Sequence, residues 1–233
     1  MKKLLSIALC AAAITSFADD SSVEIADLGV TVVTIPANQQ NTIIAASFND
    51  VATPANGVSI NNLIKTATGL AKDDQLMIIR NGSYQSWKWN GTAWEKPTTV
   101  GEGATALEPT TTVTQGEGIW FVRSTDKGEQ ITLVLYGAFV DKASTTTTAN
   151  AWNLIGNAGL KAKTITEGAK GDKIVTVVDG ALREYNYVSS KGWYYQTFAD
   201  GVRTVHDEDP TIAAGIGFWY YTKSAVKIDW VNE

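Results

Sequence analysis

The sequence predicts an all-β protein of two tandem, similar antiparallel units, each sandwich- or barrel-like with at most one short helix. A Gly-x-Gly step leading into an aromatic, β-branched run occurs twice, and Trp120 of the first run returns 99 residues later as Trp219. Asn-Gly and Asp-Gly pairs, the strongest short hairpin signals, separate further runs of strand composition. No segment shows the long apolar periodicity of an amphipathic helix.

The two copies share spacing as well as composition. Trp94 and Trp193 each precede the first glycine of the Gly-x-Gly step by 22 residues. Matched spacing at rare residue types indicates a repeated unit rather than chance. The matched glycine and tryptophan positions are Gly82, Trp94, Gly116, Gly118 and Trp120 in the first copy, and Gly180, Trp193, Gly215, Gly217 and Trp219 in the second.

The chain begins with the features of a secretory signal peptide. Two lysines precede a short apolar run at residues 4–14, and small residues occupy the positions that a signal peptidase requires before cleavage after Ala18. We expect cleavage near Ala18 and a secreted, periplasmic or cell-surface protein. No apolar run is long enough for a membrane-spanning helix, so we do not expect an integral membrane protein. The expected organisation is a leader at 1–18, a first unit at 19–142 and a second unit at 143–233.

The first copy opens with strands and one short helix. Residues 23–35 predict a strand pair or one long bent strand, and residues 42–46 predict a buried strand. A short helix is expected over 59–68, because Ser59 can cap its start and Gly69 can end it.

Turn signals then fix which side chains share a face. A two-residue hairpin turn at residues 81–82 pairs Leu76 with Trp87. A second such turn at residues 90–91 pairs Trp87 with Trp94. We expect this face to be core rather than a glycan-binding surface, because aliphatic side chains share it with the aromatic ones.

The second copy repeats the pattern with a longer second turn. Residues 174–178 and 182–187 predict a hairpin around an Asp-Gly turn, and a loop at 188–192 leads to Trp193. Asp74 and Asp172 recur at matched positions, where we expect each to cap a turn before a strand.

Each copy is expected to end in the same way. A long loop, at 97–114 and again at 196–213, leads into the Gly-x-Gly strand. A last strand follows at 131–140 and at 226–230. The counterpart of the short helix, at 164–168, has room for barely one turn.

Several of these motifs resemble a known group. The run Trp-Asn-Leu-Ile-Gly-Asn at 152–157, the Asn-Gly or Asp-Gly hairpin with an aromatic return strand, and the Gly-x-Gly-Phe-Trp run are similar to repeats in secreted bacterial tandem β-repeat proteins of unknown function. Those repeats usually carry a proline where this chain has Ala158. The resemblance implies export and a repeated β unit, and it carries over no catalytic residue.

Composition narrows the chemistry. A single histidine, His206, excludes sites that need two or three His ligands, and we expect no catalytic or cofactor-binding residues. The acidic turn of Asp207, Glu208 and Asp209 is a weak Ca²⁺ candidate, although a solvated acidic turn is the simpler interpretation. A net charge of −5 with scattered charges argues against nucleic acid as a partner.

Three functions remain open. The first is an exported non-enzymatic β-repeat protein that serves as a surface, adhesive or assembly module, with glycans or other surface proteins as partners. The second is a carbohydrate-binding module, because the chain has eight Trp and eight Tyr residues. The third is a glycoside hydrolase that uses two carboxylates. The rings expected on other faces, and therefore available to a glycan, are Tyr84, Tyr194, Tyr195 and either Tyr220 or Tyr221.

Overall fold

The computed structural model describes residues 28–37, 39, 41–52, 57–80, 83–95, 112–124, 128–139 and 142–231. Within them the fold is nearly all β, with antiparallel strands and one four-residue helix, which confirms the predicted all-β class. The leader, Gly82 and most of the loop at 97–114 lie outside the described residues. No helix in these ranges is long and apolar enough to cross a membrane.

Two large sheets have the same strand order over their first five positions. The five-stranded sheet runs β2 (Asn41–Ala45), β9 (Gly118–Val122), β5 (Gln75–Arg80), β6 (Ser83–Trp89) and β7 (Trp94–Glu95). The six-stranded sheet runs β12 (Ala151–Gly156), β19 (Gly217–Thr222), β14 (Lys173–Val178), β15 (Ala181–Val188), β16 (Gly192–Ala199) and β17 (Val202–Asp207). In both, the Gly-x-Gly strand lies between the first strand and the hairpin.

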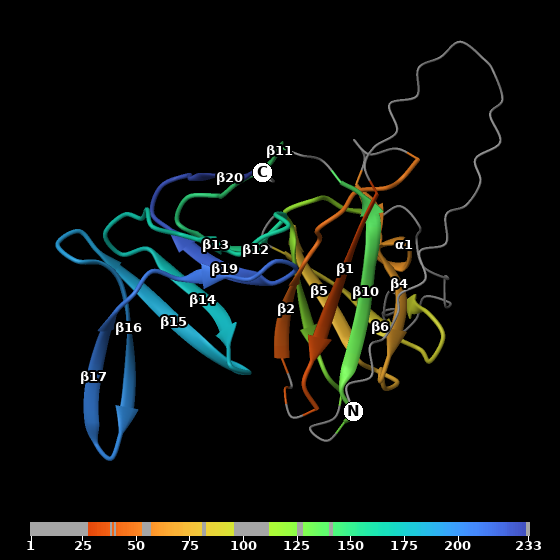
Figure 1. Cartoon of the computed structure of the whole chain (residues 1–233), viewed down its shortest axis with the longest axis horizontal. Coiled ribbons are helices and arrows are strands. Elements are labelled where there is room, and N and C mark those ends of the chain that lie inside the picture. The colour runs from red at the N-terminus through yellow and green to blue at the C-terminus, as the bar shows by residue number, and fades with distance from the viewer. Residues whose placement is uncertain are drawn as a thin grey trace, which may run out of the picture.

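Smaller sheets accompany each large one. Beside the first lie the sheet β1 (Leu28–Ile35), β10 (Ile131–Ala138) and β4 (Ile64–Thr68), the pair β3 (Val58–Ser59) with β8 (Thr112–Val113), and α1 (Ile60–Leu63). Beside the second lie the pairs β11 (Lys142–Thr146) with β20 (Lys227–Val231) and β13 (Lys163–Thr164) with β18 (Thr211–Ile212). Figure 1 shows the first group of sheets on one side of the molecule and the second group on the other, and the two groups are called the first and the second unit.

Each large sheet buries one face in its own hydrophobic cluster. Leu76, Trp87 and Trp94 are at most 3% exposed, which confirms that their face is core. Tyr185 and Trp193 occupy the corresponding cluster of the second unit. Edge-to-face or tilted ring pairs line both cores, and such pairs add to the stabilisation from burial.

The second turn of the first copy differs from the prediction. Trp94 pairs with Trp89 rather than with Trp87, because Asn90 forms a four-residue turn whose side-chain Oδ1 accepts hydrogen bonds from the backbone N–H groups of Thr92 and Ala93. A shift of two residues keeps every side chain on its face. The core prediction therefore survived an error in register, whereas a shift of one residue would have reversed it.

Other elements were predicted wrongly. The helix expected over 59–68 lasts only from Ile60 to Leu63, although Ser59 does cap it, and the chain continues as β4. Residues 164–168 form no helical turn. The loop expected at 196–213 is largely the β16–β17 hairpin, because Asp200 and Gly201 are themselves an Asp-Gly turn, with φ of 51° and 75°.

Asp74 and Asp172 perform the same structural task in the two units. Both carboxylates are buried, and each accepts backbone N–H groups from two separate segments. Asp74 accepts from Ala71 and Ser124, at 2.9 and 2.8 Å. Asp172 accepts from Ala169 and Lys223, both at 2.9 Å. The expected capping role is thereby confirmed, and each aspartate also ties its turn to the segment after the Gly-x-Gly strand.

Each Gly-x-Gly step packs against the first strand of the other large sheet where the units join. The backbone N–H of Ala45 donates to the carbonyl of Gly215, and that of Gly156 donates to the carbonyl of Gly116, both at 2.9 Å. A Cβ on Gly118 would lie 2.8 Å from the backbone nitrogen of Ile155. The second glycine of each step thus permits close approach of two backbones. Trp120 and Trp219 pack edge to face across this junction, 5.9 Å apart, so the paired tryptophans hold the units to each other.

Candidate functional site at a fork in the six-stranded sheet

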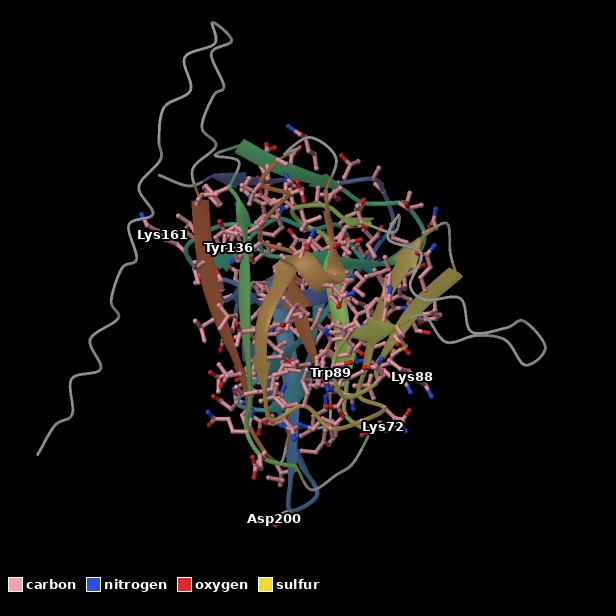
Figure 2. The ribbon with its side chains drawn as sticks, turned by 90° about the vertical axis from the view of Figure 1, so that its right-hand side faces the viewer. Lys72, Lys88, Trp89, Tyr136, Lys161 and Asp200 are labelled. Atoms are coloured by element: carbon pink, nitrogen blue, oxygen red, sulfur yellow. The ribbon has the colours of Figure 1, made fainter. Side chains whose placement is uncertain are left out.

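The six-stranded sheet divides between β15 and β16. The β14–β15 ladder runs from Lys173–Asn186 to the turn at Val178–Ala181, and the β16–β17 ladder runs from Tyr194–Asp207 to the turn at Ala199–Val202. The ladder between β15 and β16, in contrast, stops at Tyr185–Tyr195 although both strands continue. Figure 1 shows the two hairpins diverging beyond that point, and Figure 2 shows Asp200 at the far tip of one of them.

Turn chemistry explains the divergence. Asp179 and Gly180 have φ of 52° and 78°, as do Asp200 and Gly201 to within a few degrees. These are type I′ angles, which match the strong right-handed twist of a two-stranded ribbon. A ribbon of two strands twists more strongly than a wide sheet does. The hairpins therefore separate once the rungs near Trp193 no longer hold them together.

The backbone alternation directs polar groups into the gap. In a two-residue hairpin the residues flanking the turn exchange both hydrogen bonds, so alternate residues bond inward. Leu182 and Phe198 each lie one residue beyond such a bonded pair. Their N–H and C=O groups therefore point away from their own hairpin partners. These groups face each other across the open fork. An added strand could bond to both edges at once.

The two faces of the fork differ in character. Leu182 and Phe198 project from one face and are 61% and 73% exposed. On the other face the guanidinium carbon of Arg183 lies 4.3 Å from the ring centroid of Tyr195. The rings of Tyr195 and His206 are stacked at 4.5 Å. A notch of about 310 Å³ at the fork is lined by residues of both faces, among them Leu182 and Arg183.

Arg183 supplies a positive charge at the notch. A side-chain hydrogen bond with Tyr185 raises the pKa of Arg183 above its ordinary value, and burial raises the pKa of Tyr185. Among the described residues, Arg183 takes part in none of the ion pairs, which join Lys173 to Glu184, Lys191 to Asp207 and Lys227 to Asp229. Its cation is held by the hydrogen bond with Tyr185 and by the ring of Tyr195, and the Glu208 carboxylate is near enough to raise its pKa as well.

The tyrosines predicted for a glycan surface do not come together. Tyr84 is exposed on β6 in the first unit. Tyr194 and Tyr195 are neighbours on β16 and therefore point to opposite faces, and Tyr195 is buried in the core, so its place in an exposed platform was wrong. Tyr220 is fully buried and donates to the carboxylate of Asp172 at 3.1 Å, so its place in an exposed platform was wrong. Burial, together with the charge of Asp172, raises the pKa of Tyr220 above its ordinary value.

The acidic turn does not form a metal centre. Asp207 approaches Lys191 at 3.7 Å. Within the part of the chain that the structure describes, no three His, Cys, Asp or Glu side chains are placed to hold a metal ion. Asp207, Glu208 and Asp209 therefore do not converge on a common point.

A second exposed aromatic group lies at the other edge of the same sheet. Trp152 is 42% exposed and packs 5.5 Å from Tyr221, its cross-strand partner. The ammonium of Lys223 lies 5.0 Å from the ring of Tyr221. Trp152 was not among the rings predicted to be exposed, because its run reads as a buried strand.

The fork was missed by sequence reasoning. Leu182, Arg183 and Phe198 were assigned no role, and residues 196–213 were expected to be a loop. The signal that could have found the hairpin is the Asp-Gly pair at 200–201, flanked by residues with strand composition.

Comparison with known proteins provides no precedent for the site. No protein family, no curated protein and no solved structure matches the chain. The function is therefore argued from the geometry of the fork and of the exposed ring pair.

Proposed function

We propose that the chain is an exported, non-enzymatic assembly or surface module, built from a duplicated β unit, that captures an extended protein segment at the fork. One observation carries the proposal: the β15–β16 ladder stops at Tyr185–Tyr195 while both strands continue. Unpaired strand edges are sites where another strand adds, with backbone hydrogen bonds giving affinity and side-chain pockets giving specificity.

The exposed apolar side chains support the same function. Leu182 and Phe198 flank the gap at 61% and 73% exposure, and Val205 on the neighbouring strand is 46% exposed. Side chains of this size gain stability by leaving water, at roughly 25 cal/mol per Å² of apolar surface. A strand bound in the fork would cover them, whereas a module working alone gains nothing from leaving them exposed.

Association of the purified chain tests this function. Sedimentation velocity at increasing concentrations of residues 19–233 should show association, and Phe198→Asp should reduce it strongly. Tyr84→Asp is the matched control, because Tyr84 is also an exposed strand residue, at 61%, but lies in the first unit. Equal association of the wild type and Phe198→Asp would contradict the proposal, as would a chain that stays monomeric throughout.

A second function rests on the Trp152 and Tyr221 pair. An exposed tryptophan beside a tyrosine and a lysine offers a stacking surface and a hydrogen-bond donor to a sugar ring. Titration with a glycan panel should shift the tryptophan fluorescence of the wild type but not of Trp152→Ala. If no glycan shifts the wild type, this alternative is rejected.

A further inference from the structure

We infer that the fork is filled by residues 19–27 of a second copy of this chain, inserted as an additional strand between β15 and β16. This inference rests on the proposed function, because it names the segment that the fork captures. It requires a gap of strand size, a segment with the right pattern, and delivery from another molecule.

The gap has the dimensions of a short strand. Beyond the last rung at Tyr185–Tyr195, β15 still contains residues 181–184 and β16 contains residues 196–199. Three to four residues on each side correspond to roughly 10–13 Å of strand. Both sides offer open backbone groups, at Leu182 and Phe198, so an inserted strand would be bonded along both edges.

Residues 19–27 have the pattern that the two faces require. Their sequence is Asp-Asp-Ser-Ser-Val-Glu-Ile-Ala-Asp, which contains no proline or glycine. Val23 and Ile25 fall on one face of a strand and Glu24 on the other, because side chains alternate. They directly precede Leu28, the first residue of β1. The cleavage expected after Ala18 would leave this segment at the start of the mature chain.

The alternating apolar and acidic side chains of this segment match the apolar face and the Arg183 face of the fork. Residues directly opposite one another on neighbouring strands share a face, so Val23 and Ile25 can lie beside Leu182 and Phe198. Glu24 then projects to the opposite face, where the Arg183 cation lies over Tyr195. A carboxylate there would pair with an arginine whose position is already fixed, and the four acidic residues of the segment match its positive charge.

The arrangement of the units favours a second copy as donor. In Figure 1, β1 lies with the first unit on one side of the molecule, and the β16–β17 hairpin, which forms one side of the fork, lies at the far end of the second unit. A segment that leaves one molecule at β1 and enters another at the fork makes a head-to-tail contact. Such contacts generate rings when they close and filaments when they do not.

A peptide titration tests the occupant directly. A fluorescently labelled peptide of residues 19–27 is added to residues 28–233, which retain every described residue, and anisotropy is measured. Saturable binding is expected. A peptide with Val23→Lys and Ile25→Lys should bind at least about tenfold more weakly, because both apolar contacts are lost. Phe198→Asp in the protein should have a similar effect, and Tyr84→Asp should have none.

A charge reversal adds a readout that misfolding cannot imitate. The peptide with Glu24→Lys should bind the wild-type protein several-fold more weakly. Arg183→Glu should weaken the unmodified peptide and restore binding of the Glu24→Lys peptide. Restoration would fix the register of the strand, while failure of the two changes to compensate, in a variant with normal circular dichroism, would overturn the pairing.

Deleting the segment separates this inference from the proposed function. Residues 28–233 should remain monomeric at concentrations where residues 19–233 associate. If the shortened chain still associates and Phe198→Asp abolishes that association, the fork captures another segment and this inference is overturned while the proposed function stands. Peptide binding that Phe198→Asp leaves unchanged would also overturn it. If residues 19–233 stay monomeric and do not bind the free peptide, both fail.

Discussion

Each unit contains an aromatic corner, the pair of packed rings Trp89 and Trp94 in the first and Tyr187 and Trp193 in the second, and the two corners have different surroundings. In the first unit Trp89 packs on Trp94 at 5.4 Å, and the described part of β7 is Trp94–Glu95. In the second unit Tyr187 packs on Trp193 at 5.2 Å, and β16 continues for eight residues and turns back as β17. The corner therefore fills the core in both units, and in the second unit the strands run on beyond it and form the fork.

A second difference lies one strand away. Phe121 in the first unit and Tyr220 in the second each follow the matched tryptophan of the Gly-x-Gly strand. Both are buried, but only Tyr220 carries a hydroxyl, which donates to Asp172. In the first unit Ser124 Oγ occupies the corresponding relation to Asp74, at 3.1 Å. Equivalent aspartates thus keep their backbone partners and exchange their side-chain partners.

The largest expected effect comes from removing either corner tryptophan. Trp193→Ala and Trp94→Ala should each cost about 3–5 kcal/mol of unfolding free energy, because both side chains are 1% exposed and leave a large cavity. Urea unfolding followed by circular dichroism measures the loss. A loss below about 1 kcal/mol in one unit only would show that the two corners are not equivalent.

Removing a capping aspartate should have the next largest effect. Asp172→Ala leaves the N–H groups of Ala169 and Lys223 and the hydroxyl of Tyr220 without their acceptor. We expect a loss of about 2–4 kcal/mol, since each buried unsatisfied group costs about 1–3 kcal/mol and water can reach some of them. Asp74→Ala is the matched variant. A loss in the second unit but not in the first would separate their roles.

Adding a methyl group to a glycine at the junction should cost somewhat less unfolding free energy. Gly118→Ala would place a Cβ 2.8 Å from the backbone nitrogen of Ile155, and Gly217→Ala would place one 2.7 Å from the backbone oxygen of Ile155 and 2.5 Å from Cγ2 of Ile43. Overpacking of this kind costs about 1–3 kcal/mol. Both variants should lose stability, because each new methyl group meets backbone that cannot rotate away. Thermal unfolding of both variants measures the loss, and an unchanged midpoint in either one would contradict this view of the junction.

Alkaline pH should affect the second unit more than the first. The pKa of Tyr220 is raised in the folded protein, so folding favours its protonated form, and its contribution to stability is fully present below its unfolded pKa of about 10. That contribution is lost as the pH rises above this value. Tyr220→Phe should flatten the decline in unfolding free energy above pH 10. An unchanged slope would show that other groups cause it.

The smallest expected effect on stability is at the fork itself. Phe198→Asp should change the unfolding free energy by no more than about 0.5 kcal/mol, because the side chain is 73% exposed. Its effect on association should nevertheless be large. A substantial loss of stability would mean that Phe198 belongs to the fold, and the contrast between core corner and open surface would weaken.

Local chemistry made the inner part of each unit predictable. The Asp-Gly turn fixed the pairing of Ile174 with Tyr185, and the alternation of aliphatic and aromatic residues identified the buried face. The capping aspartates were recognisable because they recur at the start of matched strands. Sequence reasoning failed at Tyr195, which is buried, and left open whether Tyr220 or Tyr221 faces the core, since every position of an aromatic run is apolar and the alternation has no polar residue to mark the outer face.

By itself, the sequence determined the strand-rich class, the hairpin registers set by two-residue turns, and the residues that fill each core, because each of these depends on interactions between near neighbours in the chain. Only the tertiary structure decided that each Gly-x-Gly step forms 2.9 Å hydrogen bonds with the first strand of the other large sheet, and that β15 and β16 separate after Tyr185–Tyr195. Both outcomes depend on twist and close approach accumulated over many strands, and no short stretch of residues encodes them.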